Sequence, residues 1–331
     1  MTSIHNPPMR ARDRARLAAL GMVVLLALVL GSCWVNQDNI AIADRVNPSA
    51  AVTIGRQSLD VAYGPEAEQL LDVYAPAGTA RGTIIYFHSG GWTGGSKAVI
   101  PPVVFQQLNR GWAIVSVDYR LAGEPGVLAP QVLADVDRSI RFVKANAATL
   151  QVDTSTIVTA GWSAGGQLAL MAALAPGFQV APDLPAELAA VDPKVDAVVS
   201  MAAISDPTTW AGSSSIGLSS VEAFLGCSTD GPDALAQCDP LTPLLYSPVF
   251  RASFAAMLGL QLPPAYIAYG ADDPMVPMVS QGLPLSGAWT AAAGDRTTYV
   301  DVPPTGGHDV PAGMNKTVFD SWLTKVATRT L

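Results

Sequence analysis

Residues 156–174 read TIVTAGWSAGGQLALMAAL, and they carry the strongest evidence for the fold. Thr156–Ala160 is a short run of β-branched and apolar residues typical of a buried strand, and Gln167–Leu174 is an Ala- and Leu-rich run typical of a helix. The turn between them, GWSAG around Ser163, fits the pattern G-x-S-x-G. A strand, this turn and a helix predict a nucleophile elbow, in which the serine hydroxyl stands above the edge of a sheet. The alternative is a Gly-rich structural turn. Whether the chain also contains a base and an acid for the serine distinguishes the two.

A histidine is the first partner that such a serine needs, because a hydroxyl is a weak nucleophile without a base in hydrogen-bond reach. The chain has three histidines, at His5, His88 and His308. His5 precedes an N-terminal apolar run, and His88 lies in a Gly-rich loop directly after a predicted strand. His308 follows the last predicted strand, which fits the chain order serine, acid, histidine that such elbows use. We therefore expect His308 to be the base.

The acid that orients this base is expected between the serine and the histidine, at the end of a strand. Asp272 and Asp273 follow the predicted strand Ala265–Tyr269, and Asp206 follows an earlier apolar run. Spacing alone leaves all three open. An aspartate that is not used as the acid fits the role of an N-cap or a turn residue.

Backbone donors for an oxyanion are expected from Ala164 and from the loop that contains Gly90 and Gly91, because glycines let bare backbone approach a substrate oxygen. The histidine at the start of this loop is expected to pack and hydrogen bond within it rather than to act as a base. Trp92 and Trp162 are expected to line the substrate pocket. Ordinary half-buried aromatic packing explains Trp92 equally well.

Strand-like runs alternate with helical patterns along the body of the chain. This order predicts βαβ units and an α/β fold, with a mostly parallel central sheet and helices on both faces. Residues 206–260 break the alternation, so we expect an insertion over the edge of the sheet, a lid being one such arrangement. The expected strands are Ala51–Ile54, Leu70–Tyr74, Gly82–Phe87, Trp112–Val117, Thr156–Ala160, Val195–Ala203, Ala265–Tyr269 and Thr298–Val302. The expected helices lie at 130–147, Gln167–Leu174 and Phe319–Val326.

The first 32 residues resemble a secretory signal, with a basic stretch at 10–16, an apolar run at Leu17–Leu30 and small residues before Cys33. The order Leu-Gly-Ser-Cys also resembles a bacterial lipoprotein signal, in which Cys33 becomes a lipid-bearing N-terminus. The alternative is an uncleaved membrane anchor, although the apolar run is shorter than the roughly 20 residues that span a bilayer. We therefore expect a signal at 1–32, a tether at 33–50, one catalytic domain at 51–331, and an exported lipoprotein of the cell envelope.

Two cysteines, Cys227 and Cys238, remain if the first one carries the lipid. An oxidising compartment favours a disulfide between them, and two free buried thiols are the alternative. The formal net charge is −8, of which residues 1–32 contribute +3, so the remainder carries −8 − 3 = −11. So acidic a surface disfavours nucleic acid and anionic membranes. No His, Cys or Asp cluster has metal-ligand spacing, so we expect neither a metal nor an organic cofactor.

Several motifs resemble those of bacterial α/β-hydrolase esterases related to hormone-sensitive lipase, to acetyl and feruloyl esterases and to kynurenine formamidase. The likeness runs from about Leu71 to His308 through LDVYAP (71–76), HSGGW (88–92), DYRL (118–121), GWSAGG (161–166), FLG (224–226), SPV (247–249) and GADDPMVP (270–277). The last of these is similar to an acid motif, G-x-x-D-x-x-V-P, and the resemblance thereby implies Asp273 as the acid. Ser89 stands where that family has a glycine; the backbone donors survive this change, but a side chain there narrows the site.

These features predict a serine carboxylic-ester hydrolase in which Ser163 attacks, His308 takes its proton and Asp273 holds the imidazole. The expected partner is a small-molecule ester with a short acyl group, and membrane contact is expected only through the N-terminal lipid. The same machinery acting on an amide, as in a peptidase or formamidase, is the first alternative. A non-catalytic α/β-hydrolase-fold binding protein on the cell surface is the second, and the complete set of site residues disfavours it.

Overall fold

The computed structural model describes residues 51–211, 215–227, 239, 241–295, 297–303 and 306–331. The predicted signal, the tether with Cys33, and Cys238 therefore lie outside the described residues. Those predictions stay as predictions.

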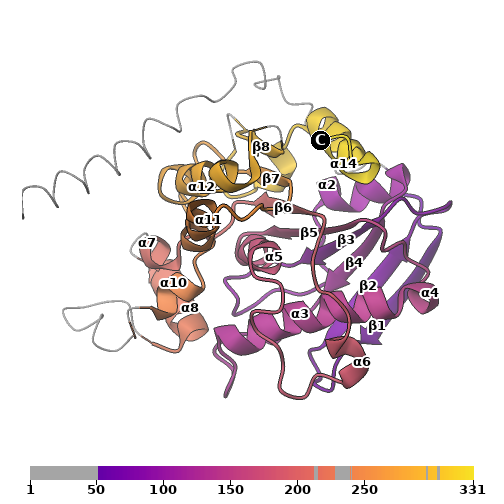
Figure 1. The fold of residues 1–331 in the computed structure, drawn as a ribbon, viewed down its shortest axis with the longest axis horizontal. Helices are drawn as coiled ribbons and strands as arrows, with labels where there is room; N and C mark the ends of the chain where they lie inside the picture. The colour runs from indigo at the N-terminus through magenta and orange to yellow at the C-terminus, as the bar shows by residue number, and fades with distance from the viewer. Residues whose placement is uncertain (1–50, 212–214, 228–238, 240, 296, 304–305) are drawn as a thin grey trace, which may run out of the picture. The chain divides into compact units, whose positions relative to one another are not determined.

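An eight-stranded sheet crosses the described part of the chain in the order β1-β2-β4-β3-β5-β6-β7-β8 (Figure 1). Two pairings are antiparallel, β1 with β2 and β2 with β4, and every pairing from β4 onward is parallel. The central strands read as continuous Val- and Ile-rich runs because both faces of a parallel sheet are covered. The strands are β1 (Arg56–Ala62), β2 (Leu70–Ala75), β3 (Thr83–Phe87), β4 (Ala113–Val117), β5 (Ile157–Trp162), β6 (Ala197–Met201), β7 (Ala265–Ala268) and β8 (Thr298–Asp301).

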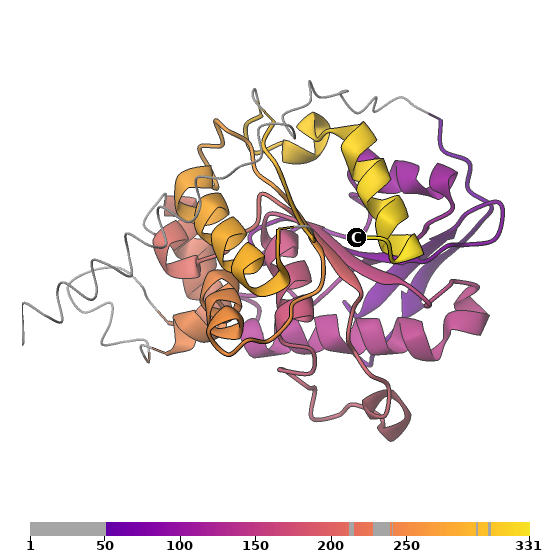
Figure 2. The same cartoon turned by 45° about the horizontal axis from the view of Figure 1, so that its top comes forward.

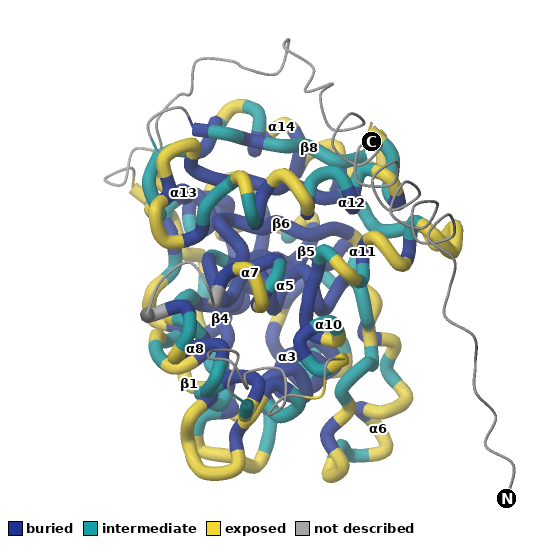
Figure 3. The backbone as a smooth tube through the Cα atoms, turned by 90° about the vertical axis from the view of Figure 1, so that its left-hand side faces the viewer, coloured by how far each residue is buried: buried dark blue, intermediate teal, exposed yellow. Residues whose placement is uncertain are grey.

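Helices cover both faces of this sheet, as expected. On one face, Ile85 and Phe87 of β3 belong to a core shared with α3 (Ala129–Ala145) and α5 (Ala164–Leu174). On the other face, Ile84 and Tyr86 belong to a core shared with α2 (Pro102–Phe105) and α14 (Lys316–Thr328). Alternation of side chains along the strand produces this division. Figure 2 shows α3 and α14 on opposite sides of the sheet, and Figure 3 shows the buried strands surrounded by more exposed segments.

The first strand was predicted wrongly at Ala51–Ile54, and the structure has it at Arg56–Ala62. This strand lies at the edge of the sheet, is only partly buried, and shifts register between Ser58 and Val61, where Asp60 has a φ of 53°. An edge strand with an irregularity needs no continuous apolar run, so the sequence pattern did not reveal it.

The described parts of the segment between β6 and β7, where the alternation was predicted to break, are mostly helical. They contain α7 (Pro207–Ala211), α8 (Ser215–Leu225), α10 (Thr242–Leu245) and α11 (Pro248–Met257). The remaining described elements are η2 (Gln106–Arg110), α4 (Ala147–Leu150), α6 (Ala186–Ala189), η3 (Met278–Gly282), α12 (Leu283–Ala293) and α13 (Val310–Gly313). No described helix combines the length and apolar character that crossing a bilayer requires.

Candidate active site

The turn from β5 into α5 holds Ser163 in a strained backbone conformation, with φ 58° and ψ −121°. Its N–H donates to the carbonyl of Met201 at 2.8 Å. A Cβ at Gly161 would lie 2.0 Å from the carbonyl oxygen of Gly165, and one at Gly165 would lie 2.0 Å from that of Phe87. Both glycines are therefore required by close backbone packing, which explains the spacing of the motif. Such an outlier at a strand–helix turn points to function.

The loop after β8 brings His308 beside this turn. The indole Nε1 of Trp162 donates to the carbonyl oxygen of His308 at 2.9 Å, and the two rings lie 5.5 Å apart. The Nδ1 of His308 lies 2.8 Å from Oδ2 of Asp273, whose side chain is fully buried. The structure thus places the predicted base next to the residue that precedes Ser163.

The three candidate acids differ clearly in their surroundings. Asp273 accepts from the backbone N–H groups of Met275 and Val276 through Oδ1, which leaves Oδ2 for the imidazole. Asp206 instead caps the first turn of α7, and its Oδ1 accepts from the N–H and hydroxyl of Thr208. Asp272 is exposed. Of the three, only Asp273 pairs with the histidine among the described residues.

The loop after β3 presents bare backbone to the same region. Gly90 and Gly91 have φ of 123° and 60°, values that side chains other than hydrogen rarely tolerate. Ala164 is the first residue of α5, where helix geometry leaves the N–H without an internal acceptor. Within the described chain, these three N–H groups donate to no other backbone carbonyl. N–H groups without a backbone acceptor in the described chain, on a loop whose base packs against the elbow and at the start of the helix after Ser163, suit an anion.

His88 is buried in the base of this loop and is not placed as a base. Its ring stacks on Tyr119 at 4.2 Å, and its Nδ1 lies 2.8 Å from the carbonyl oxygen of Ser89. Burial lowers the pKa of His88 to about 4, against the weaker opposing effect of the Ser89 contact. At neutral pH this imidazole is therefore uncharged and serves packing, as the sequence predicted.

The two tryptophans expected to line the pocket behave differently. Trp92 is fully buried, stacked on Phe224 of α8 at 4.2 Å and edge-on to Trp210 of α7 at 5.7 Å. Its Nε1 donates to Gln167 of α5. The ring is enclosed by helices distant in sequence and exposes no surface to a ligand, so this expectation needs correction. Trp162 is only partly buried and remains a pocket candidate.

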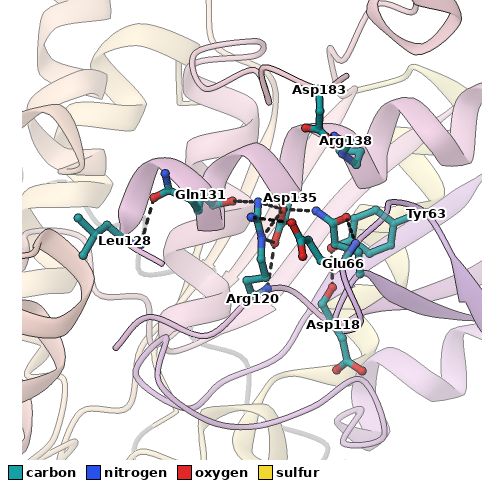
Figure 4. A network of polar contacts seen from close by, with 10 residues as sticks. Tyr63, Glu66, Asp118, Arg120, Leu128, Gln131, Asp135, Arg138 and Asp183 are labelled. Atoms are coloured by element: carbon teal, nitrogen blue, oxygen red, sulfur yellow. Dashed lines mark hydrogen bonds and ion pairs between the residues drawn. The ribbon is translucent and has the colours of Figure 1, made fainter. Parts of the chain in front are cut away.

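The DYRL motif (118–121) forms a polar network behind the site. The sequence predicted no role for these residues beyond their resemblance to the family. In the 118–121 motif, Asp118 accepts from the N–H of Lys97, Tyr119 donates to the carbonyl of His88, and Arg120 binds Asp135 of α3 through several hydrogen bonds. Figure 4 shows the contact between Arg120 and Asp135, with Glu66 and Gln131 beside it. Both ion partners are largely buried. The motif ties β4, the loop after β3 and α3 together.

Two cavities in the described part of the chain lie away from the candidate site. One lies between α3 and α5, beside Phe178, and the other lies at the opposite edge of the sheet, beside Asp196 and Lys325. No group of three or more His, Cys, Asp or Glu in the described ranges is arranged to hold a metal ion.

The sheet order, the strained elbow and the helices on both faces define the α/β-hydrolase fold. A family model described as BD-FAE matches residues 71–286, more than half of the chain, and the chain belongs to this family.

The relatives of known sequence include two esterases of Mycobacterium tuberculosis. Esterase LipQ is 27% identical over 262 residues, which cover 75% of this chain and 56% of LipQ. Esterase LipC is 32% identical over 203 residues, which cover 57% of this chain and 47% of LipC. The chain thus spans about half the length of these relatives. A solved truncated carbohydrate esterase from gut microbiota superposes with a TM-score of 0.67 at 24% identity, covering 84% of this chain and 99% of that one. This last likeness shows the fold.

Proposed function

We propose that this chain is a serine carboxylic-ester hydrolase. One observation carries the proposal: His308 is paired with buried Asp273 at 2.8 Å and is held by Trp162, the neighbour of strained Ser163. A weak nucleophile is activated by a base within hydrogen-bond reach that a third group orients, so the pairing of His308 with Asp273 supports His308 as the base for Ser163. The esterases among the relatives support the same chemistry.

The reaction follows from the roles of these groups. Ser163 Oγ attacks the ester carbonyl while His308 accepts its proton, and Asp273 stabilises the resulting imidazolium. The backbone N–H groups of Gly90, Gly91 and Ala164 receive the oxyanion. The tetrahedral intermediate then expels the alcohol, which takes the proton from the imidazolium and leaves an acyl-serine. Water, deprotonated by the histidine, attacks the acyl-serine, releasing the acid and restoring the hydroxyl.

Short acyl groups are the proposed substrates because helices of the 206–260 segment fill the space beside the loop. A Cβ at Gly91 would lie 2.8 Å from the hydroxyl of Ser220 in α8, so this helix lies directly against the oxyanion loop. The stacked rings of Trp92 and Phe224 occupy the adjoining volume. Ser163 itself is only 5% exposed. A preference for long-chain esters over acetate and butyrate would overturn this part of the proposal.

The nucleophile is tested with p-nitrophenyl acetate and butyrate and with a fluorophosphonate label. Hydrolysis and labelling are both expected in the full chain and both lost in Ser163→Ala. Ser155→Ala is the matched control, because Ser155 is exposed and precedes β5 at its other end. A folded chain that neither hydrolyses nor labels would favour a binding protein. Labelling without ester turnover would instead favour amide substrates.

We also propose that the chain is an exported lipoprotein of the cell envelope, with Cys33 as the lipid-bearing residue and a Cys227–Cys238 disulfide. The basic, apolar and small-residue order of residues 10–33 supports export. Mass spectrometry of the N-terminal peptide from the native host is expected to show a lipid on Cys33, and the Cys33→Ser chain should lack it. An intact peptide from residue 1 would favour a membrane anchor. Alkylation before reduction should leave Cys227 and Cys238 unmodified.

A further inference from the structure

Helix α11 packs in the opposite sense to an ordinary surface helix. Its small residues Ala252 and Ala255 are buried, whereas Phe250, Phe254 and Met257 are exposed at positions i, i+4 and i+7. Phe254 is 47% and Met257 71% exposed, and the rings of Phe250 and Phe254 stack on each other. A surface helix normally buries its large apolar side chains. We call Phe250, Phe254, Met257 and the following exposed Leu258 and Leu260 the α11 face.

The α11 face also lacks charge. Residues 240–271 contain no Asp or Glu and one base, Arg251, and residues 274–294 contain no charged residue, although the whole chain has 27 acidic and 19 basic residues. The guanidinium of Arg251 lies 3.7 Å from the ring centroid of Phe178, and its Nε donates to the carbonyl of Leu245. The one charge of the helix is therefore engaged with protein groups. An exposed apolar patch without charges marks an interaction site.

We propose that the α11 face docks on the surface of a lipid bilayer. Exposed Phe, Leu and Met side chains enter the boundary between headgroups and acyl chains, and a surface without charges avoids the cost of burying ions there. The acidic remainder of the chain makes a zwitterionic surface a better partner than an anionic one.

A protein partner fits the α11 face less well. A stable protein interface takes roughly 20–30 residues from each side, whereas the α11 face is one helix and its turn. The proposed lipid on Cys33 gives a second reason, because Cys33 precedes the first described residue, Ala51, by a segment that reaches at most about 65 Å when extended. An anchored chain would therefore hold the domain beside a bilayer. This second reason depends on the proposed anchor; the exposure and charge of the α11 face do not.

The test places an environment-sensitive nitrobenzoxadiazole label at Ser253→Cys in the full chain, in a Cys33→Ser background. Ser253 is exposed and lies on the same side of α11 as Phe250 and Met257, three and four residues away. The same label at Ser155→Cys, next to β5, is the matched control. With phosphatidylcholine vesicles, the emission at position 253 is expected to shift to shorter wavelength and to be quenched by brominated lipid. The label at 155 should do neither.

Two variants then test which side chains act. In Phe250→Ser/Phe254→Ser/Met257→Ser, or in the milder Met257→Glu, the emission shift at position 253 should fall to that of the 155 label. Leu59→Ser removes an equally exposed apolar side chain from β1 and should leave the shift unchanged. Circular dichroism checks that each variant is folded.

Three results would overturn the proposal. The label at 253 could remain in water although the chain is bound to vesicles. It could become shielded without lipid as protein concentration rises, which would identify a second copy as the occupant. It could be shielded without lipid at every concentration, which would mean that the chain itself covers the α11 face. None of these readouts depends on hydrolysis. A failure of membrane docking can therefore be distinguished from a failure of the proposed esterase activity.

Discussion

Two loops at the same edge of the sheet each carry a histidine beside an aspartate, and only one has the geometry of a base. After β3, the Nε2 of His88 lies 3.8 Å from Oδ1 of Asp118, too far for a hydrogen bond, and the ring is stacked and buried. After β8, the Nδ1 of His308 lies 2.8 Å from Oδ2 of Asp273, and the ring is only partly buried.

The difference lies in what each carboxylate is committed to. Asp118 accepts from the N–H of Lys97 and lies near its ammonium group, so its negative charge supports the loop. Asp273 is held by two backbone N–H groups and directs its second oxygen at the imidazole. A histidine next to an acid is therefore not a sufficient sign of catalysis. Orientation of the acid and access to substrate separate the two loops.

The largest expected effect separates the two histidines directly. His308→Gln should lower kcat/KM for p-nitrophenyl butyrate by at least about 10⁴-fold, because Ser163 loses its base. His88→Gln should lower it by less than about tenfold, since its imidazole takes no part in proton transfer. Steady-state kinetics on both folded variants provide the measurement. Comparable losses in the two would show that the loop after β3 contributes to the chemistry.

The next effect separates the aspartates. Asp273→Asn should lower kcat by roughly 10⁴-fold, because a neutral amide no longer stabilises the imidazolium or fixes its orientation. Asp206→Ala should retain activity and lose about 1 kcal/mol of stability, the usual cost of removing a helix cap. Kinetics and urea unfolding of the two variants test this pair. An inactive, folded Asp206→Ala chain would move the acid to that position.

Much of this arrangement was visible in the sequence because it depends on the local backbone. Gly161 and Gly165 are fixed by contacts within the elbow and with the neighbouring strand, so the motif reports the turn directly. The elbow pattern places a helix start directly after Ser163, whereas the range from composition, Gln167–Leu174, begins three residues late because Gly165 and Gly166 are poor helix formers. Asp273 needed the family resemblance, since spacing did not distinguish it from Asp272.

The sequence did not reveal the burial of side chains where that burial depends on packing between distant segments. The burial of Trp92 depends on Phe224 and Trp210, more than a hundred residues away, so a local motif could not reveal it. The apolar residues of α11 follow a pattern that also fits a core helix. Such a pattern does not determine which face of the helix is buried. In both cases the missing information is which helix of the 206–260 segment covers which surface.

A third difference between the two loops concerns stability, because the loop after β3 packs against the elbow. Gly165→Ala should lower the free energy of unfolding by about 4 kcal/mol, since its Cβ would lie 2.0 Å from the carbonyl oxygen of Phe87 and 2.5 Å from that of His88. Gly78→Ala is the control, because a Cβ there meets nothing within 4 Å. Guanidinium unfolding measures both. If both variants lost little unfolding free energy, the backbone at the end of β3 would have to shift at low cost to accommodate the new Cβ.

The smallest effect concerns pH and belongs to His88 alone. Its pKa in the folded chain is about 4, below the ordinary value of 6.5, because burial disfavours the charged ring. Between pH 6.5 and 4 the unfolded chain therefore binds more protons at this site than the folded chain, so stability falls as the pH falls through this window. The loss attributable to His88 should reach about 3 kcal/mol at pH 4 relative to pH 7.5.

His88→Gln tests this contribution, because glutamine does not titrate. The variant loses the stacking on Tyr119 at every pH, which shifts its whole stability curve without changing the slope. The difference in unfolding free energy between the wild-type chain and the variant should therefore shrink as the pH falls from 6.5 to 4. A constant difference across that window would mean that His88 is protonated in the folded chain. The two histidine loops would then be electrostatically alike, and only their access to substrate would distinguish them.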